Sequence, residues 1–140
     1  MNIFFYKKLF IKSIKVFIVL FSLILCFFFI SNSYVFPWEK QNIIETTLEW
    51  GGLNKLPNEI KNLTIEKRGN PFTRQFIIEF EVNNPNVIDL WIKQSKRLKD
   101  NFPKVKSNIK IYEVYPGEQK SSGGTVEIQG KKVRINMSWS

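Results

Sequence analysis

The sequence contains no histidine and only one cysteine among its 140 residues. Without histidine, Ser-His-Asp and Cys-His catalysis, imidazole metal sites and histidine-based pH switching are excluded. A single cysteine excludes an intramolecular disulfide and any zinc or iron–sulfur site that needs several cysteines. The acidic residues are too dispersed to form the oxygen-rich loop that calcium requires. We therefore expect neither a metal nor a cofactor.

Negative charge is missing from the first 38 residues, because all 12 acidic residues follow Trp38. Four lysines, by contrast, precede the first long apolar run. Residues 34–140 keep 17 of the 21 basic residues and all 12 acidic ones, which gives them a net charge of +5 out of +9 for the chain. This excess is ordinary for a domain in water. A nucleic-acid footprint would need a clustered basic face, so we expect no nucleic-acid partner.

A long uncharged segment runs from Val16 to Trp38, and its apolar part, up to Ile30, is interrupted only by Ser22. As a helix, this stretch would extend about 35 Å, enough to cross a hydrocarbon core of about 30 Å. The lysines in front of it favour a cytoplasmic N-terminus. We predict that residues 1–38 form a cytoplasmic basic tail and a single transmembrane helix.

Two other fates of this segment stay open. Its basic start, its apolar stretch and the small residues Ser31-Asn32-Ser33 also fit a signal peptide cleaved before Tyr34, which would give a secreted protein. Lipid attachment at Cys26 is the third reading, although the small residue expected just before a lipoprotein cysteine is missing. In the preferred reading the protein sits in the cell membrane, and residues 39–140 form a domain outside the cytoplasm.

The clearest strand of this domain surrounds Ile77. Its neighbours alternate between an apolar set and a polar set, which predicts one buried and one wet face of a sheet. The apolar set is Phe72, Phe76, Ile78, Phe80 and Val82; the polar set is Thr73, Gln75, Glu79 and Glu81. Ile77 is the single apolar residue on the wet side. A turn at Gly69-Asn70 predicts a hairpin with a preceding strand around Leu63 and Ile65.

A helix is predicted to begin at Asn84-Pro85, because Asn can cap a helix and Pro tolerates its first position. Val87, Ile88, Trp91, Ser95 and Leu98 then recur at helical spacing. This pattern predicts an amphipathic helix of about 14 residues packed on the sheet.

Three more strands are expected after this helix. They cover Asn108–Tyr115, where a shift in parity allows a bulge, then Val126–Ile128, then Val133–Trp139. Glu39–Asn42 is interpreted as a polar linker, and Ile43–Trp50 is left open between strand and helical turn. The sequence thus predicts an α+β domain with the order β-β-α-β-β-β and a mostly antiparallel sheet.

Residues 44–140 also resemble a family of small uncharacterised bacterial proteins, which pair an N-terminal hydrophobic segment with one small domain. The resemblance is carried by Thr46-Thr47-Leu48-Glu49-Trp50-Gly51, Leu53, Leu56-Pro57, Lys61-Asn62-Leu63, Gly69, Phe72-Thr73-Arg74, Trp91-Ile92, Ser95, Leu98 and Trp139-Ser140. It supports the domain boundary and implies neither a reaction nor a ligand.

Candidate chemistry is sparse. Glu79 and Glu81 project from the same face of one strand, as paired catalytic acids would, but a solvated strand face that keeps the sheet soluble is the preferred interpretation. We therefore do not expect an enzyme. The candidate contact surface comprises Trp50, Arg74, Ile77, Lys93 and Arg97.

Two kinds of contact are open for these residues. In the first, an exposed apolar patch around Trp50 and Ile77 makes the domain a non-covalent interaction module for another envelope protein. In the second, Arg74 and the helix cations hold an anion or small ligand, and the domain acts as a sensor. A carboxylate-based enzyme is the third and weakest alternative.

Overall fold

The computed structural model describes residues 3–70 and 72–140. Two compact units make up the chain, Met1–Asn32 and Ser33–Ser140. The described residues of the first unit, 3–32, belong to helix α1 (Ile3–Ser33). Within α1, Phe10–Ser33 has a mean hydropathy of 2.7 and is long and apolar enough to cross a membrane. The helix ends at Ser33, whereas the predicted tail and helix extended to Trp38, and a short connection leads to the domain.

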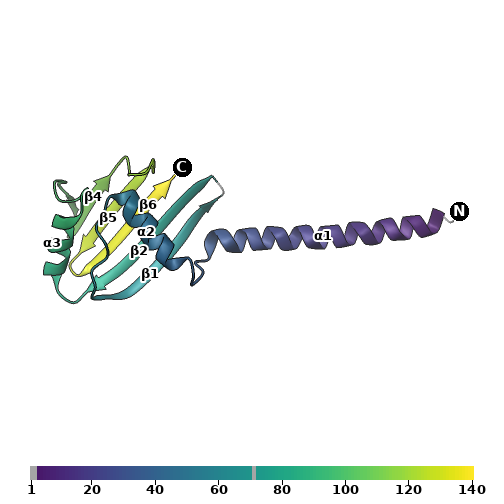
Figure 1. The fold of residues 1–140 in the computed structure, drawn as a ribbon, viewed down its shortest axis with the longest axis horizontal. Helices are drawn as coiled ribbons and strands as arrows, with labels where there is room; N and C mark the ends of the chain where they lie inside the picture. Colours follow the sequence, from purple (N-terminus) through teal and green to yellow (C-terminus); the bar gives the residue numbers. More distant parts are fainter. Residues whose placement is uncertain (1–2, 71) are drawn as a thin grey trace. The chain divides into compact units, whose positions relative to one another are not determined.

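The second unit is built on a six-stranded antiparallel sheet with the order β1-β2-β6-β5-β4-β3 (Figure 1). The strands are β1 (Ile60–Asn70), β2 (Thr73–Val82), β3 (Lys104–Lys106), β4 (Ile109–Val114), β5 (Gly123–Gln129) and β6 (Lys132–Trp139). The predicted hairpin β1–β2 is present, and β5 and β6 form a second antiparallel hairpin. An α+β fold is therefore confirmed.

Helix α2 (Lys40–Gly51) is the main difference from the predicted order. It includes Lys40–Asn42, which the sequence predicted as part of a linker, and it resolves Ile43–Trp50 as helix. Thr47, which has low helix propensity, is accommodated because its hydroxyl donates a 2.6 Å hydrogen bond to the Ile43 carbonyl. The helix ends at Gly51 and is capped by Gly52, whose left-handed φ of +55° closes the last turn.

Helix α3 (Pro85–Gln94) begins where the sequence predicted it, with the Asn84 side chain accepting a 3.0 Å hydrogen bond from the Asn86 N–H. It is ten residues long rather than about 14. The Ser95 hydroxyl then donates to the Trp91 carbonyl. Residues 96–100 form successive turns after the helix, and Leu98 within them is completely buried.

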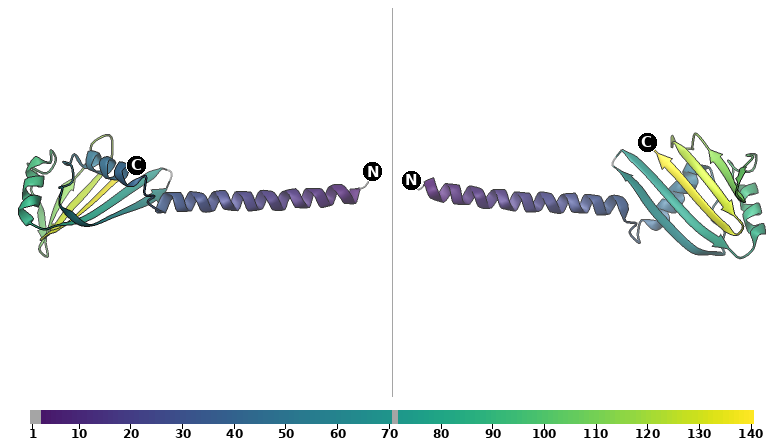
Figure 2. Two further views of the ribbon diagram at one scale, coloured as in Figure 1. Left: turned by 60° about the horizontal axis from the view of Figure 1, so that its bottom comes forward. Right: turned by 180° about the vertical axis from the view of Figure 1, so that it is seen from behind.

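Both helices contribute to one core on one face of the sheet. That core joins Ile43, Leu48 and Trp50 of α2 and Ile88 and Trp91 of α3 to the apolar sets of β2, β4, β5 and β6. Figure 1 shows α2 crossing this face, and the view from behind in Figure 2 shows the other face with α2 behind it. The sheet therefore has a covered face and an open face.

Two details of the strands also differ from the prediction. The strand β3 was not expected, and it pairs with β4 at the far edge of the sheet. β4 pairs with β5 without a shift in register, so the bulge expected in β4 is not present in this pairing. The change of parity in the sequence of β4 therefore places Ile109 and Ile111 on the open face of the sheet. The shift in register lies instead in β1, between Lys61 and Thr64, where Asn62 has a φ of +52°.

Candidate functional site

The predicted aromatic contact at Trp50 is wrong. Only 9% of Trp50 is exposed, and its ring stacks on Phe76 with centroids 5.1 Å apart. Because Ile43–Trp50 is helical, the last turn of α2 brings this ring down onto β2. The Trp50 carbonyl also accepts a 2.8 Å hydrogen bond from the Glu118 N–H, which ties the loop before β5 to the end of α2. Trp50 is therefore a core residue.

Ile77 is also unavailable for contact, although the sequence placed it on the wet face. It does lie on the open face, but its exposed fraction is only 2%. Its cross-strand neighbours are Glu66 on β1 and Asn136 on β6. Period-two alternation alone therefore does not establish exposure.

The three predicted cations do not form a common cleft. Arg74 is exposed near the start of β2, whereas Lys93 is exposed near the end of α3. Arg97 is occupied by structural contacts: Nη2 donates a 2.7 Å hydrogen bond to the Pro116 carbonyl, and Nη1 lies 3.5 Å from Glu118. These residues therefore do not make the anion site of the sensor hypothesis.

The paired carboxylates of β2 each have a separate basic neighbour on β6. Glu79 lies 3.4 Å from Arg134 Nε, and Glu81 lies 3.8 Å from Lys132 Nζ. Glu81 also accepts a 3.0 Å hydrogen bond from the Asn62 amide. In the described part of the chain, no three acidic or cysteine residues gather as metal ligands would.

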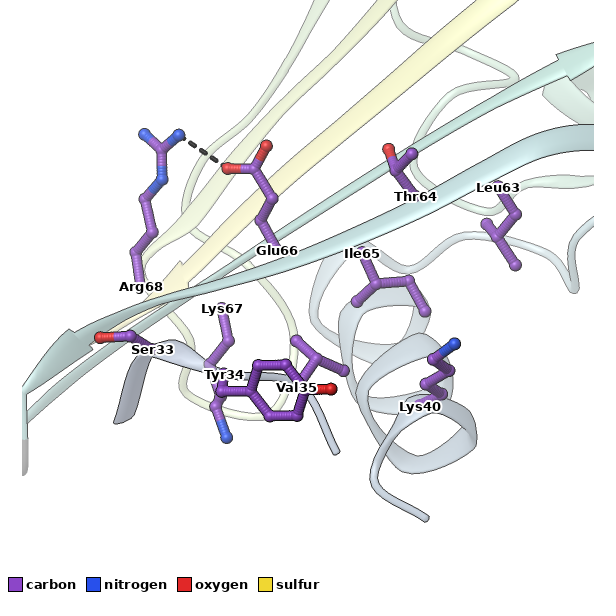
Figure 3. A pocket seen from close by; sticks show the side chains of 10 residues that line it. All are labelled: Ser33, Tyr34, Val35, Lys40, Leu63, Thr64, Ile65, Glu66, Lys67 and Arg68. Carbon is purple, nitrogen blue, oxygen red and sulfur yellow. Dashed lines mark hydrogen bonds and ion pairs between the residues drawn. The ribbon is translucent and has the colours of Figure 1, made fainter. Parts of the chain in front are cut away.

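A large hollow runs beside β1. It has a volume of about 600 Å³ and lies within the second unit. Its lining comprises Ser33, Tyr34, Val35, Lys40, Leu63, Thr64, Ile65, Glu66, Lys67 and Arg68. We call it the β1 groove. Figure 3 shows Ile65 and Lys67 on the side of the strand that faces Val35 and Lys40, and Glu66 and Arg68 on the other side.

The strand that borders this groove is an edge strand. β1 is 11 residues long, and β2 is its single neighbour in the sheet. Its backbone groups on the outer side therefore have no strand partner. At the opposite edge, β3 is only three residues long, so it offers little backbone for pairing with another strand.

A compact ion pair holds the start of α2 against this strand. Lys67 Nζ lies 3.0 Å and 3.2 Å from the two carboxylate oxygens of Glu39, and it also lies 5.9 Å from the centre of the Phe36 ring. Burial alone would raise the pKa of Glu39, but hydrogen bonds from Lys67 and the Phe36 N–H, with the charges of Lys67 and Arg74, hold it below the usual value. The connection Ser33–Glu39 is thus fixed beside β1.

The sequence predicted the strand around Leu63 and Ile65 but gave no reason to select it as a site. The order of the strands in the sheet decides which strand lies at an edge, and this order depends on the complete fold. The one available signal was the row of charges Glu66-Lys67-Arg68, since charged residues are common on edges. Comparison with known proteins adds no further guide, because no protein-family model, curated protein or solved structure matches the chain.

Proposed function

We propose that the protein is a membrane-anchored module that binds an extended segment of another envelope protein by adding it as a strand to β1. The observation that supports this most directly is the 11-residue edge of β1 with a groove of about 600 Å³ beside it. In this mode, main-chain hydrogen bonds provide affinity, and pockets for alternate side chains provide specificity. No covalent step is involved.

The groove has the composition that such binding needs. Leu63, 41% exposed, and the half-buried Val35 and Ile65 offer apolar surface for every second side chain of a bound segment. Lys40 adds positive charge, which favours an acidic residue in that segment. A segment of six to eight residues would extend about 20–27 Å in β conformation, well within the length of β1.

Membrane anchoring is the second part of the proposal. Phe10–Ser33 has the length and hydropathy of a membrane span, and Lys12 and Lys15 stand at its N-terminal end. By the positive-inside bias, the N-terminus is cytoplasmic and Ser33–Ser140 lies outside. The alternative is a cleaved signal sequence, with the same domain released. Carbonate washing of membranes separates the two, because a spanning protein stays in the pellet.

The binding site is tested by a pair of edge variants in the full-length protein. Leu63→Asp places a charge on the β1 edge, and Val105→Asp places the same charge on the exposed β3 edge. After crosslinking in native membranes, Leu63→Asp should reduce recovery of the partner about tenfold or more, whereas Val105→Asp should leave it unchanged.

A second measurement identifies the mode of binding. Hydrogen exchange of the β1 amides should slow when the purified partner is added, because a new strand gives the outer N–H groups acceptors. Equal recovery with both variants, together with unchanged exchange in β1, would contradict the proposal. Loss of recovery with Val105→Asp alone would move the contact to β3.

A further inference from the structure

We propose that the domain makes a second contact with the membrane, through an aromatic and basic face that binds anionic lipid headgroups. This inference rests on the proposed anchoring by α1. The face, which we call the juxtamembrane face, comprises Tyr34, Trp38, Lys40, Phe72 and Arg74. It adjoins the β1 groove but is made mostly of other residues.

The aromatic side chains of the juxtamembrane face are highly exposed, and exposure of such large apolar surfaces to water is unfavourable. Trp38 is 76% exposed and Phe72 is 81% exposed, while Tyr34 is 56% exposed. In the connection after α1, Tyr34 and Trp38 both pack on Phe36, with ring centroids 5.1 Å and 4.8 Å apart. Such rings prefer the headgroup region of a bilayer, where their apolar bodies and polar tips are both accommodated.

The connection and the tip of the β1–β2 hairpin are held together. The Lys67–Glu39 ion pair joins the connection to β1 three residues before the end of that strand. Arg74, in the register pair Gly69–Arg74 next to the turn, is near enough to affect the ionisation of Glu39. The hairpin tip therefore lies at the same end of the domain as Ser33, where the apolar helix ends.

The turn presents Phe72 away from the core. The Asn70 side chain accepts hydrogen bonds from the Phe72 and Thr73 N–H groups, at 2.9 Å and 3.1 Å. The sequence pattern places Phe72 on the buried face with Phe76, and the structure contradicts this because Phe72 lies in the turn rather than in β2. A turn that fixes an exposed phenylalanine next to an arginine fits insertion at a lipid surface.

The positive charges of the juxtamembrane face favour an anionic lipid over a neutral one. Among the described residues, Lys40 and Arg74 have no carboxylate within 4.0 Å, unlike Lys67 and Arg68, whose partners are Glu39 and Glu66. Each of these two cations lies two residues after an exposed aromatic residue, Lys40 after Trp38 and Arg74 after Phe72, and such a combination complements an anionic headgroup and its glycerol region. A neutral surface would satisfy the rings but not the cations.

Photo-crosslinking of the full-length protein tests the inference. Phe72, Phe102 and Phe27 are replaced one at a time by the photoreactive analogue p-benzoylphenylalanine, which retains an aromatic ring. Phe102 is a matched control, because it is 93% exposed but precedes β3 at the opposite edge of the sheet. Phe27 lies in the apolar helix and reports on anchoring by itself.

In vesicles with about 30% phosphatidylglycerol, position 72 should give roughly tenfold more phospholipid adduct than position 102. Adding Lys40→Glu and Arg74→Glu should reduce the adduct at position 72 about threefold or more, and leave that at position 27 unchanged. In vesicles of phosphatidylcholine alone, position 72 should give the reduced level without these substitutions.

The control positions separate the ways in which the inference fails. Lipid adducts at position 27 but not at position 72 would overturn the second contact and leave the anchor intact. No lipid adduct at either position would overturn the anchoring as well. A protein adduct at position 72 would assign the hairpin tip to protein binding instead of lipid, and equal adducts at positions 72 and 102 would show that no particular face is selected.

Discussion

Glu39 illustrates how one side chain can position a whole segment. It receives hydrogen bonds from Lys67 and from the Phe36 N–H, and its backbone carbonyl accepts from the Ile43 N–H within the first turn of α2. The side chain and the backbone carbonyl of this one residue thus join the connection, α2 and β1. About a third of the Glu39 side chain remains exposed, so solvent screens the pair and its net contribution to stability is modest.

The lowered pKa of Glu39 sets the sign of a pH effect. The ionised carboxylate is favoured by folding, so its contribution is present above the usual pKa of 4.5 and is lost as the pH falls through the lowered value. Glu39→Gln should therefore reduce the free energy of unfolding at pH 7 by about 0.5–1 kcal/mol. Below the lowered pKa, wild type and variant should have equal stability.

Thermal unfolding of detergent-solubilised protein, followed by near-ultraviolet circular dichroism from pH 3 to 7, measures this difference. Glu66→Gln is the control, because Glu66 pairs with Arg68 where both side chains are more than half exposed. A constant difference between wild type and Glu39→Gln at every pH would contradict the assignment.

At the level of the elements, helix α2 shows why sequence patterns were insufficient. Ile43–Trp50 contains β-branched residues at several positions, which favours a strand, yet burial of Ile43, Leu48 and Trp50 on the sheet stabilises the helix. The long alternation of β2 and the capped start of α3 could be predicted, because each depends only on residues that are close together in the sequence. The packing partner of α2 could not, because it comes from β2 and β6.

The same reasoning explains which parts of the candidate site were missed. Ile77 was proposed from its parity in the strand, and parity distinguishes the faces of a sheet but not what covers them. Ile77 faces away from the core and is nevertheless buried. The β1 groove depends on strand order, which requires the complete fold.

The role of α2 gives a direct prediction. Trp50→Ala removes the ring that stacks on Phe76 and should lower the free energy of unfolding by about 3–5 kcal/mol. Trp38→Ala removes an equally large ring that is 76% exposed and should change stability by less than about 0.5 kcal/mol. Urea unfolding of the two variants measures both values, and similar losses would contradict the assignment of Trp50 to the core.

At the scale of the whole molecule, the domain has the contacts to fold without the long helix. Its core cluster and the side chains packed against it come from residues between Val35 and Met137. The sheet pairs all six strands within Ile60–Trp139. The core of the domain and the apolar helix that is long enough to cross a membrane thus belong to two separate parts of the chain.

A chain of residues 33–140 should therefore be soluble and should unfold in a single cooperative transition. The expected midpoint in urea lies close to that of the domain in the full-length protein, since the same core is buried in both. Measurement of both transitions by tryptophan fluorescence tests this expectation. A broad, non-cooperative transition in the shorter chain would show that α1 is needed for folding.

The shortness of the connection after α1 limits where a partner can be. Six residues lie between Ser33 and Lys40, so at most about 25 Å of extended chain separates the two helices, and Ser33–Val35 themselves line the β1 groove. If α1 spans a bilayer, a bound strand must come from chain that emerges close to the same bilayer. Confinement to that layer raises the effective concentration of such segments to the millimolar range, so weak strand pairing is sufficient for stable association.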